Sequence, residues 1–416
     1  MPPSTQALLE PETDDPVPEP VTQDTQTAPR QPTSGPPSGA VAGRTNPFEV
    51  ILRILGIAIP LYVFLVSVKL MGGGFELLGS GFAESLIATT SNPLVGLFIG
   101  ILATSIVQSS STTTSMTVGF VAAGILSIEN AIPIIMGANI GTTVTNTLVS
   151  IGHVRQSAAF RRAFAAATVH DFFNLLCVGL LLPLELMTGF LSKTAIALTD
   201  VVAGSSGAEY KSPIKAAVKQ GYTAILDLLK SMGLEGTPLA IVVLLVGIGL
   251  TFLCLVLITK NMRKLIAGPL EEALNRSLGR SGLIGIGIGI LVTIAVQSSS
   301  ITTSLLVPLC AAGILSLENA FPLMLGANIG TTVTALLASA ATDSTAGLTI
   351  ALVHAFFNLV GTALFYPVRR LRMIPIRLAE GLAERASQNP GWVLAYVGGA
   401  FVLIPLLGMW IFEGAG

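Results

Sequence analysis

Charged residues are scarce in this chain of 416 residues. Asp, Glu, Lys and Arg make up 11% of it, whereas a soluble domain carries about 25%. Apolar residues make up 51%, and the mean hydropathy is +0.77. This composition excludes an ordinary soluble domain and predicts a polytopic membrane protein, which we expect to be all-α. Segments of about 20 apolar residues, the length that crosses a bilayer, lie near 49–71, 131–152, 163–188, 239–259, 346–366 and 391–412.

Cysteine and histidine are also rare. The three cysteines all fall in apolar segments and are expected to be buried thiols, with neither a disulfide framework nor metal-ligand spacing: they are Cys177, Cys254 and Cys310. We expect no resident cofactor and no nucleic-acid partner.

An intramembrane hydrolase is the enzyme alternative, because His170 and Asp171 are adjacent and serines abound. Neighbouring residues on a helix point to different faces, however, so this pair is not spaced as part of a catalytic triad. The second histidine of the same type, His354, is followed by Ala355 and lacks even the carboxylate. We expect the protein not to be an enzyme.

The first 46 residues differ in composition from the rest. They hold ten of the 24 prolines and many Thr, Ser and Gln residues. Such a composition cannot bury a core, so we expect 1–46 to be a disordered tail, on the cytoplasmic side of the membrane. It contains no apolar stretch typical of a signal peptide.

Two polar clusters interrupt apolar sequence without adding any charge. Residues 108–115 read QSSSTTTS, and residues 297–304 read QSSSITTS. Each cluster lies within a 35-residue run, 94–128 or 283–317, that contains no Asp, Glu, Lys, Arg or His. A run of this length with a polar centre predicts two half-spanning helices that meet at the cluster as a re-entrant hairpin. After the runs, Ser127 and Ser316 are expected to cap the next helices.

The chain contains an internal repeat. Residues 108–145 and 297–334 match at 27 of 38 positions, including GANIGTTVT at 137–145 and 326–334. Further on, VHDFFNL at 169–175 corresponds to VHAFFNL at 353–359. Self-similarity of this kind predicts two copies of one structural unit. The expected organisation is the tail 1–46, a first repeat unit 47–189, an extracytoplasmic connection 190–238, a second unit 239–390 and a C-terminal membrane helix 391–416.

Basic residues beside the spans indicate how the two copies are oriented. Three clusters lie next to spans: Arg155, Arg161 and Arg162; Lys260, Arg263 and Lys264; and Arg369, Arg370, Arg372 and Arg377. Cytoplasmic loops are enriched in Lys and Arg, and all three clusters can be cytoplasmic together. Span 163–188 then starts inside the cell while its counterpart 346–366 ends inside. The two repeats are therefore predicted to be inverted.

Inverted repeats with broken helices are typical of secondary transporters. Hydroxyl and amide groups can donate to an oxyanion and can also offer oxygen to a hard cation. A multiply charged anion is costly to bind in an apolar site without compensating charge, and neither cluster holds Lys or Arg. The clusters therefore predict cation-coupled anion uptake. For the glycines of GANIGTTVT, close helix packing is the favoured interpretation.

The doubled QSSS and G-x-N-I-G-T motifs resemble those of the type II sodium-dependent phosphate cotransporters. The resemblance runs from about residue 48 to the end and includes FRRAFAAATVHDFFN and PIRLAEGLAERA. It implies sodium-driven symport of inorganic phosphate through a site between two facing QSSS hairpins in the cell membrane. The residues expected to bind phosphate and sodium, all hydroxyl or amide side chains, are Gln108, Ser109, Ser110, Ser111, Thr112, Thr113, Asn139, Thr142, Thr143, Gln297, Ser298, Ser299, Ser300, Thr302, Asn328, Thr331 and Thr332.

Two departures from that family affect what is expected. Electrogenic members carry an Asp shortly before the FRR stretch, where this chain has Gln156, so we expect electroneutral transport. The cysteine-containing outer loop of animal members is missing from 190–238. Two alternatives stay open: another small oxyanion as the substrate, or an ion channel, because rings of neutral oxygens also select cations.

Overall fold

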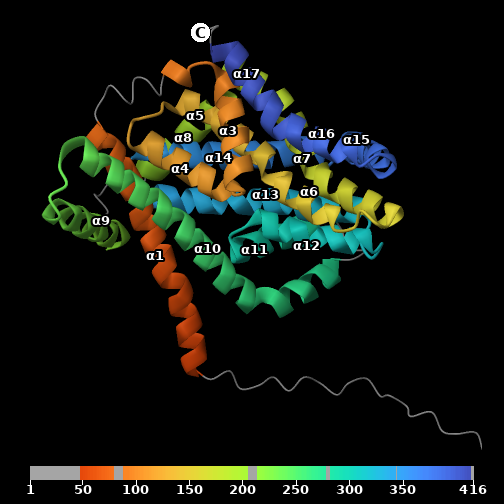
Figure 1. Cartoon of the computed structure of the whole chain (residues 1–416), viewed down its shortest axis with the longest axis horizontal. Coiled ribbons are helices and arrows are strands. Elements are labelled where there is room, and N and C mark those ends of the chain that lie inside the picture. Colours follow the sequence, from red (N-terminus) through yellow and green to blue (C-terminus); the bar gives the residue numbers. More distant parts are fainter. Residues whose placement is uncertain (1–46, 79–87, 205–212, 278–281, 343, 414–416) are drawn as a thin grey trace, which may run out of the picture. The chain divides into compact units, whose positions relative to one another are not determined.

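The computed structural model describes residues 47–78, 88–204, 213–277, 282–342 and 344–413. In these ranges the chain forms helices and no strand, which confirms the all-α prediction. The predicted tail 1–46 lies outside the described residues. Figure 1 shows the helices in chain colours.

The two repeats contain the same series of helices. In the first, these are α1 (Pro47–Leu78), α3 (Pro93–Val107), α4 (Ser110–Ala122), α5 (Ile128–Ile140), a short 3₁₀ turn η1 (Gly141–Thr143), α6 (Val144–Ile151) and α7 (Ser157–Thr188). In the second, they are α10 (Gly236–Ser277), α11 (Gly282–Val296), α12 (Ser299–Ala311), α13 (Leu317–Ala340) and α14 (Thr345–Phe365). The connection holds α8 (Phe190–Gly204) and α9 (Pro213–Ser231), and the chain ends in α15 (Arg369–Gln388), α16 (Gly391–Gly398), the π-helical η2 (Gly399–Leu403) and α17 (Ile404–Glu413).

Seven helical segments of the described chain are long and apolar enough to cross a membrane. Six coincide with the spans that hydropathy indicates, and the seventh is α13. The apolar character of α13 is interrupted by Glu318 near its start and by Asn328 with its neighbouring threonines. This span completes the predicted topology: if α10 and α14 both run toward the basic side, the chain has to cross once more between them.

Each uncharged run consists of two short helices that meet at its QSSS cluster. Helices of 15 and 13 residues flank Gln108 in the first hairpin (α3–α4), and helices of the same two lengths flank Gln297 in the second hairpin (α11–α12). Both glutamines adopt the left-handed backbone conformation, with φ of 57° and 56°, and no other described residue except glycine has a positive φ. The predicted helix break is therefore present in both copies with the same geometry.

The hairpins dock through glycines of the GANIGTTVT motifs. A Cβ atom at Gly137 of α5 would lie 2.1 Å from the Leu97 carbonyl oxygen of α3, and one at Gly326 of α13 would lie 2.1 Å from the Ile286 oxygen of α11. Backbones approach this closely only where no side chain intervenes. These glycines therefore serve helix packing, as expected. Ser127 and Ser316 cap α5 and α13, accepting bonds from the amides of Asn130 and Asn319 at 3.1 and 3.3 Å, which confirms the expected caps.

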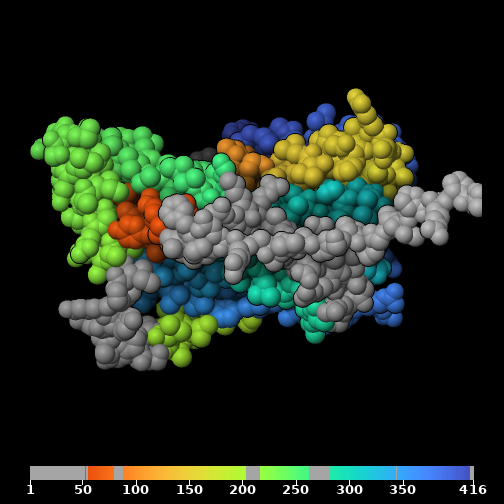
Figure 2. Space-filling view, turned by 90° about the horizontal axis from the view of Figure 1, so that it is seen from below, coloured from red at the N-terminus to blue at the C-terminus, as the bar shows by residue number. Residues whose placement is uncertain are grey.

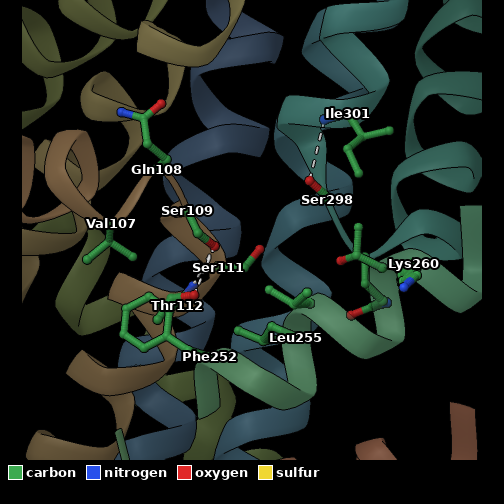
Figure 3. Close-up of a pocket in the computed structure, with 13 residues that line it drawn as sticks. Val107, Gln108, Ser109, Ser111, Thr112, Phe252, Leu255, Lys260, Ser298 and Ile301 are labelled. Atoms are coloured by element: carbon green, nitrogen blue, oxygen red, sulfur yellow. Dashed lines mark hydrogen bonds between the residues drawn. The ribbon is translucent and has the colours of Figure 1, made fainter. Parts of the chain in front are cut away.

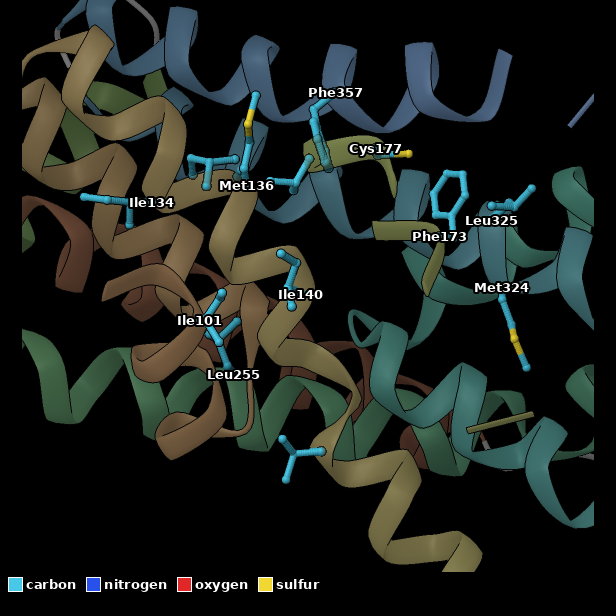
Figure 4. Packing of buried hydrophobic residues seen from close by; sticks show 14 of the residues in the cluster. Ile101, Ile134, Met136, Ile140, Phe173, Cys177, Leu255, Met324, Leu325 and Phe357 are labelled. Carbon is cyan, nitrogen blue, oxygen red and sulfur yellow. The ribbon is translucent and has the colours of Figure 1, made fainter. Parts of the chain in front are cut away.

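Apolar side chains from both repeats form one core. Figure 4 shows part of it, where Met136 of α5, Phe173 of α7, Met324 of α13 and Phe357 of α14 are at most 1% exposed. The two long helices α1 and α10 cross at the side of the bundle (Figure 1). They are joined by a bond of 2.7 Å between the hydroxyls of Ser67 and Thr251.

The first basic cluster meets α15, the helix that carries the third basic cluster. Arg161, at the start of α7, forms an ion pair of 2.5 Å with Glu384 of α15, and α15 packs along α7. The side chains of Arg263 and Lys264 lie outside the described residues. The opposite orientation of the two repeats across the membrane, and the unit boundaries named above, stay predictions.

Replacing Gly137 with alanine tests the glycine docking. The added methyl group would meet backbone rather than a flexible side chain, so we expect destabilisation of roughly 1–3 kcal/mol, as for other overpacked cores. Gly179→Ala is the matched control, because a Cβ atom there has nothing within 4 Å. Thermal unfolding in detergent should show a lower midpoint for Gly137→Ala alone. Equal midpoints for the two variants would contradict this account.

Candidate functional site

The tips of the two hairpins have the same hydrogen-bond pattern. The side-chain oxygen of Gln108 accepts from the Thr145 hydroxyl at 2.8 Å, and that of Gln297 accepts from Thr334 at 3.0 Å. The amide nitrogen of Gln108 donates to the Ser105 carbonyl, and that of Gln297 donates to the Ile294 carbonyl at 2.6 Å. Each glutamine thus links the end of its hairpin's first helix to the helix carrying the GANIGTTVT motif. These bonds hold both amides at defined positions.

Serines begin the second helix of each hairpin. Ser109 is the N-cap of α4 and accepts from the amide of Thr112 at 3.2 Å, while Ser298 is the N-cap of α12 and accepts from the amide of Ile301 at 3.4 Å. The first amides of a helix lack partners within the helix and carry the positive end of its dipole. Both tips therefore present helix N-termini.

The two tips line one cavity of about 630 Å³. The first hairpin contributes Val107, Gln108, Ser109, Ser111 and Thr112, and the second contributes Gln297, Ser298 and Ile301. The remaining wall is formed by α10, through Phe252, Leu255, Val256, Thr259 and Lys260. Figure 3 shows Ser109 and Ser298 projecting from separate hairpins, with Lys260 near the edge of the cavity. The cavity thus combines helix N-termini, hydroxyls, amides and one ammonium group.

Sequence reasoning did not find Lys260 as a cavity residue. It belongs to the basic cluster that indicates the cytoplasmic side, and the uncharged QSSS clusters give no sign that a lysine lies beside them. Only the packing of α10 against the hairpin tips brings it there. Its side chain is exposed.

Six of the seventeen expected site residues line this cavity, and the others lie elsewhere. Thr113 and Thr302 accept bonds from Thr104 and Thr293, at 3.0 and 2.9 Å, and so tie the two helices of each hairpin together. Several hydroxyls bond to carbonyls of their own helices, namely those of Thr142, Thr331 and Thr332. Ser110 and Ser299 are buried, Ser300 is half-buried, and none of the three lines the cavity.

The two motif asparagines, Asn139 and Asn328, belong to a different buried cluster. Asn328 donates to the side-chain oxygen of Asn174 at 3.0 Å and accepts from Nε2 of His170. Asn358 donates to the side-chain oxygen of Asn139 at 3.4 Å. Each of these contacts joins one repeat to the other. We call these five residues the crossover cluster.

The two ring nitrogens of His170 have different partners. Nε2 faces the side-chain oxygen of Asn328, which can only accept, and Nδ1 lies 3.1 Å from the Thr143 hydroxyl. Asp171 instead accepts from the Tyr396 hydroxyl at 2.7 Å. No hydrogen bond between His170 and Asp171 is found in the described structure, so the His–Asp bond of a hydrolytic triad is not present at this pair.

The repeats differ where Asn146 meets α12. Asn146 donates to the Thr303 hydroxyl at 2.8 Å and accepts from the Ser304 hydroxyl at 2.8 Å. This contact brings α6 beside α12, and Figure 2 shows the residues near 150 next to those near 300. In the second repeat the residue at the place of Asn146 is Ala335, and Ser115, the counterpart of Ser304, has no hydrogen-bond partner. The internal symmetry is therefore broken beside the hairpins.

Gln156 does not lie in the cavity. It precedes the first residue of α7, and its side chain is exposed without bonding to the helix amides. Within the described residues, no group of three or more His, Cys, Asp or Glu side chains could hold a metal ion.

The fold and the paired hairpins define a polytopic helical membrane protein in which two polar hairpin tips line one cavity. The pattern of the Na+/Pi-cotransporter family matches residues 63–202 and 250–372. The chain therefore belongs to that family, whose members are transporters rather than enzymes.

Curated relatives agree with this assignment. Sodium-dependent phosphate transport protein 2A of Ovis aries is 35% identical over 418 residues, which cover 83% of this chain and 65% of the relative. Protein 2B of Homo sapiens is 33% identical over 453 residues, covering 86% of this chain and 65% of the relative. The chain thus spans slightly less than two thirds of the length of these proteins. No solved structure matches it.

Removing the side chain of Asn328 separates a structural role from ligand binding. Asn328→Ala leaves Nε2 of His170 and the oxygen of Asn174 without partners, at roughly 1–3 kcal/mol for each buried group. We expect a lower unfolding midpoint in detergent, with the phosphate KM little changed. Gln220→Ala, at an exposed position of α9, is the control. A raised KM at unchanged stability would instead make Asn328 a ligand.

Proposed function

We propose that this protein carries inorganic phosphate into the cell together with sodium, by alternating access of one site to the two membrane faces. It acts in the cell membrane, with its N-terminus in the cytoplasm. The observation that carries the proposal is the shared cavity, which both QSSS tips line although 189 residues separate Gln108 from Gln297. Membership of the Na+/Pi-cotransporter family supports the choice of ions.

The tips suit phosphate because two helices begin there. The amides at the start of α4 and α12 and the hydroxyl of Ser111 can donate to phosphate oxygens, and the dipoles of both helices favour negative charge. Lys260 adds a positive charge at the edge of the cavity. Phosphate bound between the tips would contact both repeats at once, so movement of one repeat against the other would carry the site from one face to the other.

The same tips suit sodium because two helices also end there. The last carbonyls of α3 and α11 lie beside Gln108 and Gln297, and helix C-terminal ends coordinate cations in transporters with broken helices. Each glutamine oxygen keeps a lone pair after accepting from its threonine. A hairpin tip therefore offers cation ligands on its incoming helix and anion ligands on its outgoing helix. Sodium bound at this place would offset the charge of the phosphate.

The direct test is uptake of radiolabelled phosphate into proteoliposomes. Uptake should require a sodium gradient and should saturate in both ions, because the anion is held poorly without its cations. Choline in place of sodium should reduce uptake to the level of protein-free vesicles. Unchanged uptake in choline would refute sodium coupling. Flux that rises with concentration without saturating would favour a channel, and competition by sulfate at equal concentration would favour a broader oxyanion specificity.

The same vesicles can be used to measure the net charge that crosses the membrane with each phosphate. We propose two sodium ions for each divalent phosphate, because Gln156 replaces the carboxylate that the resemblance associates with an additional sodium, and an amide carries no charge to neutralise a third cation. Sodium-driven uptake should then be insensitive to an imposed membrane potential. A sustained inward current on addition of phosphate would overturn the two-sodium assignment.

Variants at the two glutamines test the tips. Gln108→Ala and Gln297→Ala remove an amide from each tip and should abolish transport. The glycine variant at each position lacks the amide but adopts the left-handed conformation without strain, so comparison with alanine separates loss of the amide from backbone strain. Thr145→Val removes only the bond that orients Gln108, and should lower transport less. Gln220→Ala is again the control, and near-normal transport by both alanine variants would contradict a role of the tips in binding.

A further inference from the structure

Each long helix that precedes a hairpin carries a single lysine in its membrane-length segment. Lys69 lies in Leu55–Leu78 of α1, and Lys260 lies in Gly236–Asn261 of α10. Lys69 precedes Gln108 by 39 residues, and Lys260 precedes Gln297 by 37 residues. In both helices a methionine follows two residues after the lysine. The two lysines therefore occupy corresponding places in the two repeats.

A lysine within a membrane span is costly and is a candidate for a functional role. The QSSS clusters do not explain either lysine, because they contain no charge. The duplication makes a chance placement of both lysines an unsatisfactory explanation. Their positions relative to the hairpin tips indicate what they do.

The lysines lie toward opposite ends of the crossing between α1 and α10. The two helices are antiparallel, since Ser67 bonds Thr251 at 2.7 Å while the side chain of Asn261 donates to the Gly56 carbonyl at 2.5 Å. Lys69 is thus level with α10 residues near 249. At 1.5 Å of rise per residue, this level is about 16 Å along α10 from Lys260.

Lys260 lies at the cavity that the hairpin tips share. Its side chain is exposed, and it is the one charged residue among those that line the cavity. No acidic group among the lining residues offsets its charge. Figure 3 shows Lys260 on α10, apart from Ser109 and Ser298 of the two tips.

Lys69 lies beside a second cavity, at the other end of α4. This cavity, of about 250 Å³, is lined by Lys69 and Glu76 of α1, by residues of α4 near its C-terminus, and by the turn between α13 and α14. The hairpin tip is at the N-terminal end of α4, a helix of 13 residues. Lys69 is only partly exposed, and α1 packs on α4 beside it, where Gly119 faces Val68. None of the residues that line this second cavity belongs to a hairpin tip.

We propose that Lys260 and Lys69 are the anion-receiving groups of the two access routes, one for each membrane face. Lys260 attracts phosphate to the tips through the cavity that it lines together with them. Lys69 does the same from the opposite side once α1 and α4 separate there. The proposal rests on the proposed function and adds to it a residue for each direction of entry. The expected mechanism is electrostatic, so its effect falls as salt screens the charge.

The test compares the two faces of the membrane. Right-side-out and inside-out vesicles from expressing cells report phosphate uptake from the outer and inner faces, respectively. Lys260→Gln should raise the phosphate KM roughly three- to tenfold from the inner face and little from the outer face, as expected for loss of one steering charge. Lys69→Gln should do the reverse. Lys219→Gln, an exposed lysine of α9, should change neither KM.

Further variants and a change of lipid distinguish an effect of the Lys260 charge from a structural effect and from binding of a lipid headgroup. Lys260→Arg should keep a normal KM. Lys260→Cys should regain it after modification with an aminoethyl thiosulfonate and lose more affinity with the sulfonate reagent; the three native cysteines are buried. The inner-face effect should persist in purely phosphatidylcholine vesicles, where no anionic lipid headgroup can occupy Lys260.

The results that would refute the proposed function differ from those that would refute the proposal for the two lysines. Absence of sodium-dependent uptake by the unaltered protein would refute the proposed function. If the unaltered protein transports phosphate, the proposal for the lysines is overturned by variants that shift KM equally at both faces or at neither. It is also overturned if the aminoethyl and sulfonate reagents act alike at position 260.

Discussion

A helix that stops inside an apolar bundle leaves backbone amides and carbonyls that need partners, and this requirement shapes the molecule around Gln108 and Gln297. Water cannot satisfy these groups in the hydrocarbon region, so protein or a hydrated cavity must do so. Ser109 and Ser298 cap the outgoing helices, and the glutamine side chains bond to carbonyls of the incoming ones. The groups that stay available face a common cavity. The two helix breaks thus form a site with hydrogen-bond donors and acceptors on both sides.

Holding two such breaks together requires the repeats to pack closely. Glycines in the GANIGTTVT motifs let each hairpin approach its supporting helix at backbone distance. The crossover cluster then joins the repeats through Asn139 to Asn358 and through Asn328 to His170 and Asn174. Polar bonds of this kind fix the register between helices more narrowly than apolar contacts do, because each donor has few acceptable partners. In one short motif, the glycines therefore dock a hairpin and the asparagine joins the two repeats.

The two repeats are alike at the tips and different beside them. Asn146 has Ala335 as its counterpart, and Asp171, which bonds Tyr396, has Ala355. Arg162 donates to the carbonyls of Cys310 and Ala311 at the end of α12, at 3.1 and 3.0 Å, whereas the start of α14 meets the end of α4 through Gly347 and Ala122. The second hairpin is therefore held by more polar bonds than the first. In any single conformation, the two repeats cannot both be open to the same membrane face. Such differences between them are therefore required.

Local residue types determined the helical class, six of the seven spans in the described chain, the helix breaks and the helix caps of this protein. Hydropathy, the loss of apolar character at QSSS, and a serine before an acidic first turn all act over a few residues, so sequence was enough. The seventh span, Leu317–Ala340, mixes apolar and polar residues as its counterpart Ile128–Ile151 does, with Glu318 and Asn328 at the places of Glu129 and Asn139, so alignment of the two copies indicates it where hydropathy alone does not. Packing decided that Asn139 and Asn328 join the repeats while Gln108 and Gln297 line a cavity, although all four are amides in duplicated motifs. The motifs name side chains that can bind ions, but contacts between helices far apart in the chain determine which of those side chains stay free to do so. Packing likewise decided the place of Lys260, because α10 crosses the hairpin tips. No local sequence pattern indicates this crossing.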